Sequence, residues 1–287
     1  MRFGLTVNLK RVGSRDAIHA LIDWAENAGQ ELVLCDELRP VLENNFEYAS
    51  AEEIASKVDI VVSMGGDGTL LSTARNVGTT GTPILGINLG SLGFLTQLTP
   101  QQLVPALELI LQGKYVLKER MHLKADVDGH ETIETPYALN DIVLDNGPVA
   151  RILDINLKVD GEDVVTYKAD GLIISTPTGS TAYNLAVGGP IMHPDLEAMI
   201  ASPISPFSLT TRPMIFPPDV LMELTVVTEG RHAILTLDGQ VMIRLHNGEH
   251  VRISRANFRS KMVTFPETSY YKLLKSKLHW GISPASF

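Results

Sequence analysis

The first 113 residues alternate short apolar runs with stretches in which apolar residues recur at helical spacing. Residues 14–28 show this spacing, with Ile18, Leu21 and Ile22 on one face, and are predicted to form an amphipathic helix. The other predicted elements are strands at RFGLTVN, ELVLC, VDIVVSM and TPILGIN, a short helix after the capping box at 50–53, and helices over 69–77 and 99–113. This alternation predicts an N-terminal α/β domain with a parallel sheet over residues 1–114.

From residue 115 to 265 the pattern changes to short β-rich runs separated by turn residues. Asp-Gly pairs at 128, 160, 170 and 238 mark four of these turns, and Asp-Gly is a strong hairpin signal. Residues 115–265 are therefore predicted to form a second, mainly antiparallel domain. Helical spacing returns at 270–280, and we expect the segment 266–287 to form a helix that packs back on the first domain.

The composition is that of a globular protein, with 287 residues of which 44% are hydrophobic and 6% aromatic. The net charge of -9 argues against a nucleic-acid partner, because nucleic-acid binders usually carry a basic face. No apolar run reaches the ~20 residues of a membrane span, so no membrane partner is expected. The single cysteine, Cys35, fits a reducing compartment, taken as the cytoplasm, and lies in an apolar run that predicts a core position.

The segment SMGGDGTLL at 63–71 follows an apolar strand and opens a helix. Such a turn lies at the carboxyl edge of a parallel sheet, where open α/β folds bind ligands. Gly65, Gly66 and Gly68 let a phosphate approach the backbone amides closely. The alternative is a tight turn in which Asp67 or Thr69 caps the helix.

Asp67 raises the question of why a site that attracts anions holds an acid. The chain contains neither GxxxxGK(S/T) nor GxGxxG, which disfavours a P-loop ATPase and the dinucleotide fingerprint. In phosphoryl transfer, an aspartate beside the phosphates either accepts the proton of an attacking hydroxyl or holds Mg²⁺. Repulsion between a carboxylate and a phosphate ~4 Å apart is several kcal/mol at a dielectric of ~20, so a proton or a cation has to lie between them.

A second candidate site spans residues 168–183, KADGLIISTPTGSTAY, where an apolar strand ends in a turn rich in hydroxyl groups. These hydroxyls suit ribose, adenine or phosphate, and Tyr183 offers a ring on which a base can stack. The alternative is a loop whose Ser and Thr side chains only satisfy turns and the next helix start.

Asn140 and Asp141 form a polar pair inside the apolar run ALNDIVL. Burying such a pair is costly without partners, which a bound nucleoside would supply; the alternative is an exposed edge or a bulge. From the residues alone, the turn at 238–240 is a structural hairpin turn. The eight histidines show no metal-ligand spacing, so no protein-held metal site is predicted.

Together these segments resemble the NAD kinases, the enzymes that phosphorylate NAD to NADP. The similarity runs in family order through GGDGTLL at 65–71, LGINLGSLGFLT at 85–96, ALND at 138–141, DGLIISTPTGSTAYNLAVGGP at 170–190 and LDGQ at 237–240. Lipid kinases share GGDGT, whereas the run DGLIISTPTGSTAY is specific. The resemblance implies a phosphotransferase, with a β-sandwich-like C-terminal domain, NAD and ATP as substrates, a divalent cation (Mg²⁺) accompanying ATP, and a homodimer or homotetramer.

The resemblance also implies residue roles. Asp67 would be the general base that takes the proton of the adenosine 2′-hydroxyl as it attacks the γ-phosphate, with Gly68 beside it. The other matched positions are Asn140 and Asp141 for the adenosine part of NAD, Thr181, Ala182, Tyr183, Asn184 and Ala186 for the adenine pocket, Lys168 and Asp170 for the second nucleoside, and Arg151 and Gln240 for further contacts.

Three positions depart from the family pattern. Asp141 stands where many members have glutamate, Ala186 replaces a common serine, and Lys168 stands where bacterial relatives often carry arginine. These changes bear on affinity and on the choice between NAD and NADH.

Two alternative functions remain at the level of sequence. A lipid kinase of the same superfamily would need membrane attachment, and the chain shows no basic amphipathic anchor. A non-catalytic NADP-binding regulator would not need Asp67, whose presence therefore favours an enzyme.

Overall fold

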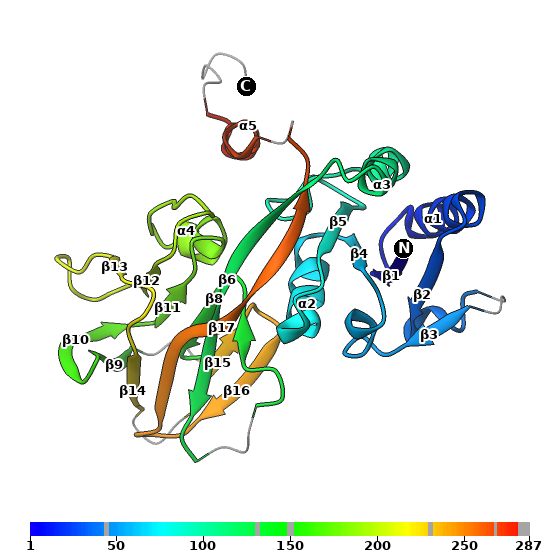
Figure 1. The fold of residues 1–287 in the computed structure, drawn as a ribbon. Helices are drawn as coiled ribbons and strands as arrows, with labels where there is room; N and C mark the ends of the chain where they lie inside the picture. Colours follow the sequence, from blue (N-terminus) through cyan, green and yellow to red (C-terminus); the bar gives the residue numbers. More distant parts are fainter. Residues whose placement is uncertain (43–45, 130–132, 148–151, 229–231, 267–268, 281–287) are drawn as a thin grey trace. The chain divides into compact units, whose positions relative to one another are not determined.

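The computed structural model describes residues 1–42, 46–129, 133–147, 152–228, 232–266 and 269–280. The chain divides into two compact units that interleave along the sequence. Unit 1 contains Met1–Thr73, Thr82–Lys118 and Lys261–Phe287, and unit 2 contains Ala74–Gly81 and Glu119–Ser260. Figure 1 labels their helices and strands.

Unit 1 is built on a parallel sheet with the strand order β5-β4-β1-β2-β3. Its strands are β1 (Arg2–Val7), β2 (Glu31–Cys35), β3 (Glu47–Ala49), β4 (Ile60–Gly65) and β5 (Ile84–Asn88). Every residue of β4 is buried, as expected for a central strand of a parallel sheet that is covered on both faces. The predicted parallel α/β organisation is therefore confirmed.

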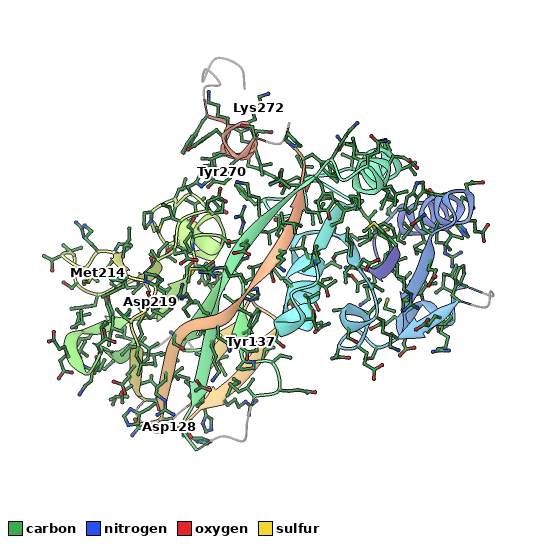
Figure 2. All side chains as sticks on the ribbon, viewed as in Figure 1. Asp128, Tyr137, Met214, Asp219, Tyr270 and Lys272 are labelled. Atoms are coloured by element: carbon green, nitrogen blue, oxygen red, sulfur yellow. The ribbon has the colours of Figure 1, made fainter. Side chains whose placement is uncertain are left out.

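The helices of unit 1 are α1 (Ser14–Ala28), the first part of α2 (Asp67–Val77), α3 (Leu103–Leu111) and α5 (Tyr270–Leu278), with 3-10 turns at η1 (Asp36–Leu38), η2 (Ile54–Ser56) and η4 (Pro100–Gln102). The indole of Trp24 donates a hydrogen bond of 2.6 Å to Glu108 Oε1 and joins α1 to α3. Helix α5 is capped by Ser269, whose hydroxyl accepts the Lys272 N–H; Figure 2 labels Tyr270 and Lys272 on this helix. Cys35 is 3% exposed, which confirms its predicted core position, and burial raises the pKa of its thiol to about 12.

Unit 2 consists of two sheets packed over one hydrophobic core. The first has the order β10-β9-β14-β17 with β6 and β7 alongside, and the second is the antiparallel series β13-β12-β11-β8-β15-β16. The core between them includes Ile155 and Leu157 from the first sheet and Leu172 and Ile174 from the second. The predicted antiparallel second half is confirmed.

The elements that form these sheets and their connections are β6 (Val116–Val127), β7 (Tyr137–Ala138), β8 (Asp141–Asp145), β9 (Leu153–Val159), β10 (Glu162–Ala169), β11 (Gly171–Ser175), β12 (Met199–Ile204), β13 (Met214–Phe216), β14 (Met222–Val227), β15 (Ala233–Leu237), β16 (Val241–Leu245) and β17 (His250–Thr264), with α4 (Tyr183–Ala186), η3 (Gly78–Thr80) and η5 (Gly179–Thr181). The long strands β6 and β17 lie side by side in Figure 1.

Candidate nucleotide and phosphoryl-transfer site

The Asp67 carboxylate lies at the first turn of α2 and is held by the loop that follows β5. Its Oδ1 atom accepts hydrogen bonds from the Leu95 N–H (3.1 Å), the Thr96 N–H (2.9 Å) and the Thr96 hydroxyl (2.9 Å). Its Oδ2 atom accepts one hydrogen bond, from the Phe94 N–H at 2.8 Å. The carboxylate therefore binds a neighbouring loop rather than the amides of its own helix.

The two carboxylate oxygens of Asp67 differ in their remaining capacity to accept hydrogen bonds. A carboxylate oxygen has about two lone-pair positions, so three donors fill Oδ1 while Oδ2 has room for one more. A hydroxyl that approaches Oδ2 can donate a hydrogen bond and then its proton. This geometry suits a general base that stays anchored throughout the reaction.

Gly93 lets the loop approach this closely. A Cβ atom added at Gly93 would lie 1.9 Å from Asp67 Oδ1, so only glycine fits beside the carboxylate. The loop is further tied to the end of β5, because Asn88 Nδ2 donates to Thr96 Oγ1 at 2.6 Å. The motif LGSLGFLT therefore supplies the hydrogen-bond donors that hold the Asp67 carboxylate.

Arg11 is a basic residue of this region that the sequence pattern did not single out. It follows β1, and its guanidinium lies 3.5 Å from the Cβ position of Gly66 and 3.7 Å from that of Gly90. Within the described part of the chain, Arg11 is exposed and has no acidic partner. Its only sequence signal is its place after the carboxyl end of a strand, where ligands of parallel sheets bind.

Asp141 is the first residue of β8, an interior strand between β11 and β15, and Asn140 directly precedes it. Asp141 is 5% exposed, so the alternative of an exposed edge is wrong. Its carboxyl group makes no hydrogen bond to any described residue. Burial, together with the nearby negative charge of Asp238, raises the pKa of Asp141 to about 7. A buried carboxyl without a partner is the group that a ribose hydroxyl would satisfy.

The turn between β15 and β16 does more than reverse the chain. Asp238 has φ 51° and Gly239 has φ 66°, which confirms the predicted hairpin turn. The Asp238 side chain is buried and accepts backbone hydrogen bonds from residues 139–141, a role that the local pattern did not reveal. The neighbouring Gln240 accepts a hydrogen bond from Arg75 through Oε1.

Most hydroxyls of the segment 175–181 are used within the protein. Thr176 Oγ1 donates to the Leu139 carbonyl at 2.6 Å, and Ser180 Oγ donates to the Pro177 carbonyl at 2.6 Å. These bonds support the loop interpretation for those two residues. Thr178 differs, because its buried Oγ1 has no hydrogen-bond partner in the described structure.

The adenine-pocket candidates at 181–186 fall into two groups. Asn184 is fully buried, and its carboxamide donates to the carbonyls of Ser180 and Pro190 and accepts from the Ser202 hydroxyl, so it shapes the segment from inside. Tyr183 is 45% exposed and can present a ring to a base. The remaining candidates are Thr181 in η5, Ala182 between η5 and α4, and Ala186 at the end of α4.

Lys168 and Asp170 lie at the other end of β11 from Asp141. The register pairs Ser175 with Asp141 at one end of β11 and Gly171 with Asp145 at the other, a separation of roughly 14 Å along the strand. Lys168 forms an ion pair of 2.8 Å with Asp154, a residue that the sequence did not indicate. The structure therefore does not bring Lys168 and Asp170 together with the Asn140–Asp141 pair.

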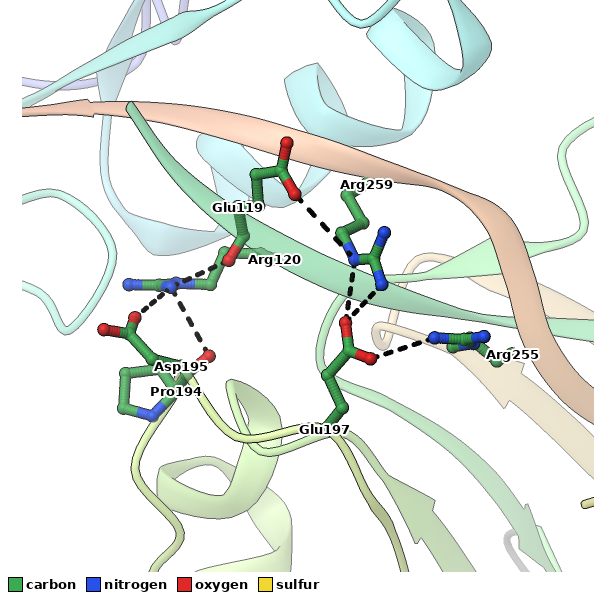
Figure 3. A network of polar contacts seen from close by, with 7 residues as sticks. All are labelled: Glu119, Arg120, Pro194, Asp195, Glu197, Arg255 and Arg259. Atoms are coloured by element: carbon green, nitrogen blue, oxygen red, sulfur yellow. Dashed lines mark hydrogen bonds and ion pairs between the residues drawn. The ribbon is translucent and has the colours of Figure 1, made fainter. Parts of the chain in front are cut away.

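An ion-pair network fixes the loop that follows α4, as Figure 3 shows. Glu197 accepts hydrogen bonds from Arg255 (2.9 Å) and Arg259 (2.8 Å), which both lie on β17. Arg120 on β6 donates to Asp195 Oδ1 at 2.7 Å. Single exposed ion pairs contribute little, but a shared network orders a loop more effectively.

Three further points concern Arg151, metal binding and membrane-spanning helices. Arg151 lies outside the described residues. Among the described residues, no group of three His, Cys, Asp or Glu side chains is placed to hold a metal ion. None of the described helices combines the length and the apolar character needed to cross a bilayer.

Both halves of the chain match families of known proteins. Residues 11–115 match the ATP-NAD kinase N-terminal domain, and residues 139–265 match the ATP-NAD kinase C-terminal domain. An NAD kinase of Geotalea daltonii is 46% identical over 234 residues, which cover 81% of this chain and 82% of the relative. An NAD kinase of Geobacter metallireducens is 43% identical over 263 residues, which cover 88% of this chain and 93% of the relative.

Two solved structures of related kinases have the same fold as this chain. An NAD kinase from Archaeoglobus fulgidus in complex with ATP has a TM-score of 0.78 at 25% identity, covering 97% of this chain and 99% of that chain. Yeast NADH kinase complexed with NADH shares the fold, with a TM-score of 0.89 at 23% identity, covering 99% of this chain and 89% of that chain. The fold and these similarities define a phosphotransferase that makes NADP from NAD and ATP. The chain belongs to the ATP-NAD kinase family.

Proposed function

We propose that the phosphoryl group goes to the 2′-hydroxyl of the adenosine ribose of NAD, with Asp67 as the general base. Asp67 Oδ2 takes the hydroxyl proton while the hydroxyl oxygen bonds to the γ-phosphorus of ATP. The bond to the β–γ bridging oxygen breaks, and ADP leaves. The observation that supports this role is the open lone pair of Oδ2 on a carboxylate otherwise held by loop amides.

The proposed donor is the magnesium complex of ATP, whose cation would neutralise part of the phosphate charge. Arg11 adds a second positive charge beside the glycine turns at Gly66 and Gly90. Arginine suits this position because its guanidinium donates paired hydrogen bonds to phosphate oxygens.

Arg11→Ala is expected to raise KM for ATP by about tenfold or more and to leave KM for NAD within about twofold, because one charged hydrogen-bond donor to phosphate is lost. Steady-state kinetics with each substrate varied in turn measure this. The matched control is Lys10→Ala, which removes an exposed neighbouring charge and should change neither constant. An increase confined to KM for NAD would reject the ATP assignment of Arg11.

The proposed NAD contacts come from unit 2, and residues 115–265 form the proposed NAD-binding domain. Asn140 and Asp141 hold the adenosine ribose, the segment 181–186 lines the adenine pocket, and Lys168 and Asp170 meet the second nucleoside. The exposed ring of Tyr183 supports stacking on adenine, and the unpartnered Asp141 carboxyl supports a ribose contact.

Tyr183→Ala is expected to raise Kd for NAD by about five- to thirtyfold, because base–aromatic stacking contributes roughly 1–3 kcal/mol. Isothermal titration calorimetry with NAD, in the absence of ATP, measures this Kd. Tyr271→Ala is the control, since that ring is 65% exposed on α5. Equal Kd values for wild type and Tyr183→Ala would remove Tyr183 from the pocket.

The remaining parts of the proposal concern assembly and location. We propose a homodimer or homotetramer, which light scattering coupled to size-exclusion chromatography would measure. The buried single Cys35 supports the cytoplasm as the compartment.

The deciding experiment incubates the pure protein with NAD and Mg·ATP and follows NADP with an NADP-specific dehydrogenase. Phosphorus NMR of the product then identifies the phosphorylated hydroxyl. Diacylglycerol is tested in parallel. NADP carrying a 2′-phosphate supports the proposal, whereas a phosphorylated lipid without NADP overturns it.

A further inference from the structure

Unit 2 buries a charged cluster around the start of β8 that the proposed reaction does not use. Arg75 is 7% exposed and Asp238 is 8% exposed. Arg75 donates to Gln240 Oε1, and its charge acts on Asp238. Charged side chains are rarely buried this deeply, because they lose the solvation of water. The charged groups of the cluster therefore need hydrogen-bond partners that offset the lost solvation.

Asp238 finds these partners in one short backbone segment. Its Oδ2 accepts the Leu139 N–H at 2.9 Å, and its Oδ1 accepts the N–H groups of Asn140 at 2.7 Å and Asp141 at 3.2 Å. Its own N–H donates to the Asp141 carbonyl at 2.9 Å. Four hydrogen bonds to three consecutive residues fix both the position and the direction of residues 139–141.

The same segment is held from the opposite side by the loop after β11. The Leu139 carbonyl accepts from Thr176 Oγ1, and the Asn140 carbonyl accepts from the Thr176 N–H at 2.9 Å. The backbone of residues 139–141 is therefore engaged on both sides. The side chains of Asn140 and Asp141 make no hydrogen bond within the described structure and remain available for a ligand.

The positive charge of Arg75 favours the ionised form of Asp238, the form that accepts all of these bonds. Burial raises the pKa of Asp238, and the three backbone N–H groups and the charge of Arg75 oppose that rise. A protonated Asp238 would lose acceptor capacity toward the backbone amides. His122 supplies no charge here, since burial and the positive charge of Arg75 lower its pKa to about 3.

We propose that Arg75 and Asp238 are positioning residues for NAD, which set the backbone of residues 139–141 so that the Asn140 and Asp141 side chains meet the ribose. Gln240 belongs to this apparatus as the partner of Arg75. The inference rests on the proposed NAD contacts of Asn140 and Asp141. It extends the site to Arg75 and Asp238, which act through the backbone rather than by touching the substrate.

Arg75→Gln tests the pair, with Arg75→Lys as the conservative variant. KM for NAD is expected to rise about tenfold or more in Arg75→Gln, to recover in part in Arg75→Lys because the charge is kept, and KM for ATP should stay within about twofold. Leu157→Val is the matched control: it loosens the unit 2 core and lowers the melting temperature from β9, a strand that pairs with β10 and β14. The inference is overturned if Arg75→Gln keeps the wild-type KM for NAD or if Leu157→Val raises it equally.

A pH profile provides a readout that a purely structural role would not move. Asp141 and Asp238 act on each other, and Arg75 from α2 acts on Asp238, whereas the uncharged His122 from β6 is coupled to Arg75 alone. Asp238→Asn removes the negative charge that helps to raise the Asp141 pKa, so the inflection of KM for NAD should move to lower pH. An unmoved inflection contradicts the inference. If Arg75→Gln does not fold, Arg75→Lys and this pH profile test the positioning role. NADP formation by the wild-type protein tests the proposed function separately.

Discussion

Asp67→Asn is expected to lower kcat by about 10²- to 10⁴-fold, the usual contribution of a positioned general base. Asparagine has nearly the same shape but does not accept a proton, so the 2′-hydroxyl must attack without deprotonation. Because the base acts on the attacking hydroxyl in the transition state, Kd for NAD should stay within about tenfold. Single-turnover kinetics with saturating ATP, together with titration of NAD, separate the two quantities.

The control for this variant has to account for the loop that Asp67 anchors. In Asp67→Asn, an amide nitrogen replaces an acceptor of the loop, so some loss of order is expected. Thr96→Val removes one donor from Oδ1 and the partner of Asn88 but keeps the carboxylate. Its kcat should fall by no more than about tenfold. Normal turnover in Asp67→Asn would disprove the base assignment, and an equal loss in Thr96→Val would assign the effect to the anchor.

The elements that the sequence predicted correctly are those whose signal is local. Helix α1 begins and ends where its apolar spacing predicted, because burial of one face follows directly from that spacing. The capping box at Ser50 was interpreted as a helix start, but only the 3-10 turn η2 forms before β4 begins at Ile60. A segment this short has little helical stability of its own, because isolated helices of fewer than about 12–15 residues are marginal in water.

Asp170-Gly171 shows how a local signal can have another cause. The pair was predicted to be a turn, yet Gly171 is the first residue of β11. A Cβ atom at Gly171 would lie 2.4 Å from the Leu144 carbonyl oxygen, so the glycine serves close strand packing. Composition alone does not distinguish these two uses of glycine.

The site itself was predictable only in part. GGDGT and the hydroxyl-rich segment were recognisable from residue type, but their partners are distant in sequence. The loop amides on Asp67 come from residues 27–29 positions away, and the amides on Asp238 from residues 97–99 positions away. Tertiary contacts of this kind leave no periodic trace, which is why Asp238 was predicted to be a turn residue only.

Gly93→Ala is expected to lower kcat by about 10- to 100-fold although it removes no functional group. The new methyl group would lie 1.9 Å from Asp67 Oδ1, so the carboxylate or the loop has to shift. Displacement of a catalytic group by about 1 Å can cost about 100-fold in rate. Kd for NAD should change little. Single-turnover rates and NAD titration measure both effects.

The double variant Asp67→Asn/Gly93→Ala tests whether Gly93 acts through the carboxylate. If it does, kcat of the double variant should equal that of Asp67→Asn, because the displaced group has already lost its function. Independent effects would instead multiply. A multiplied loss would mean that the loop after β5 contributes to turnover by another route, such as contact with ATP, and the role of Gly93 beside Asp67 would have to be abandoned.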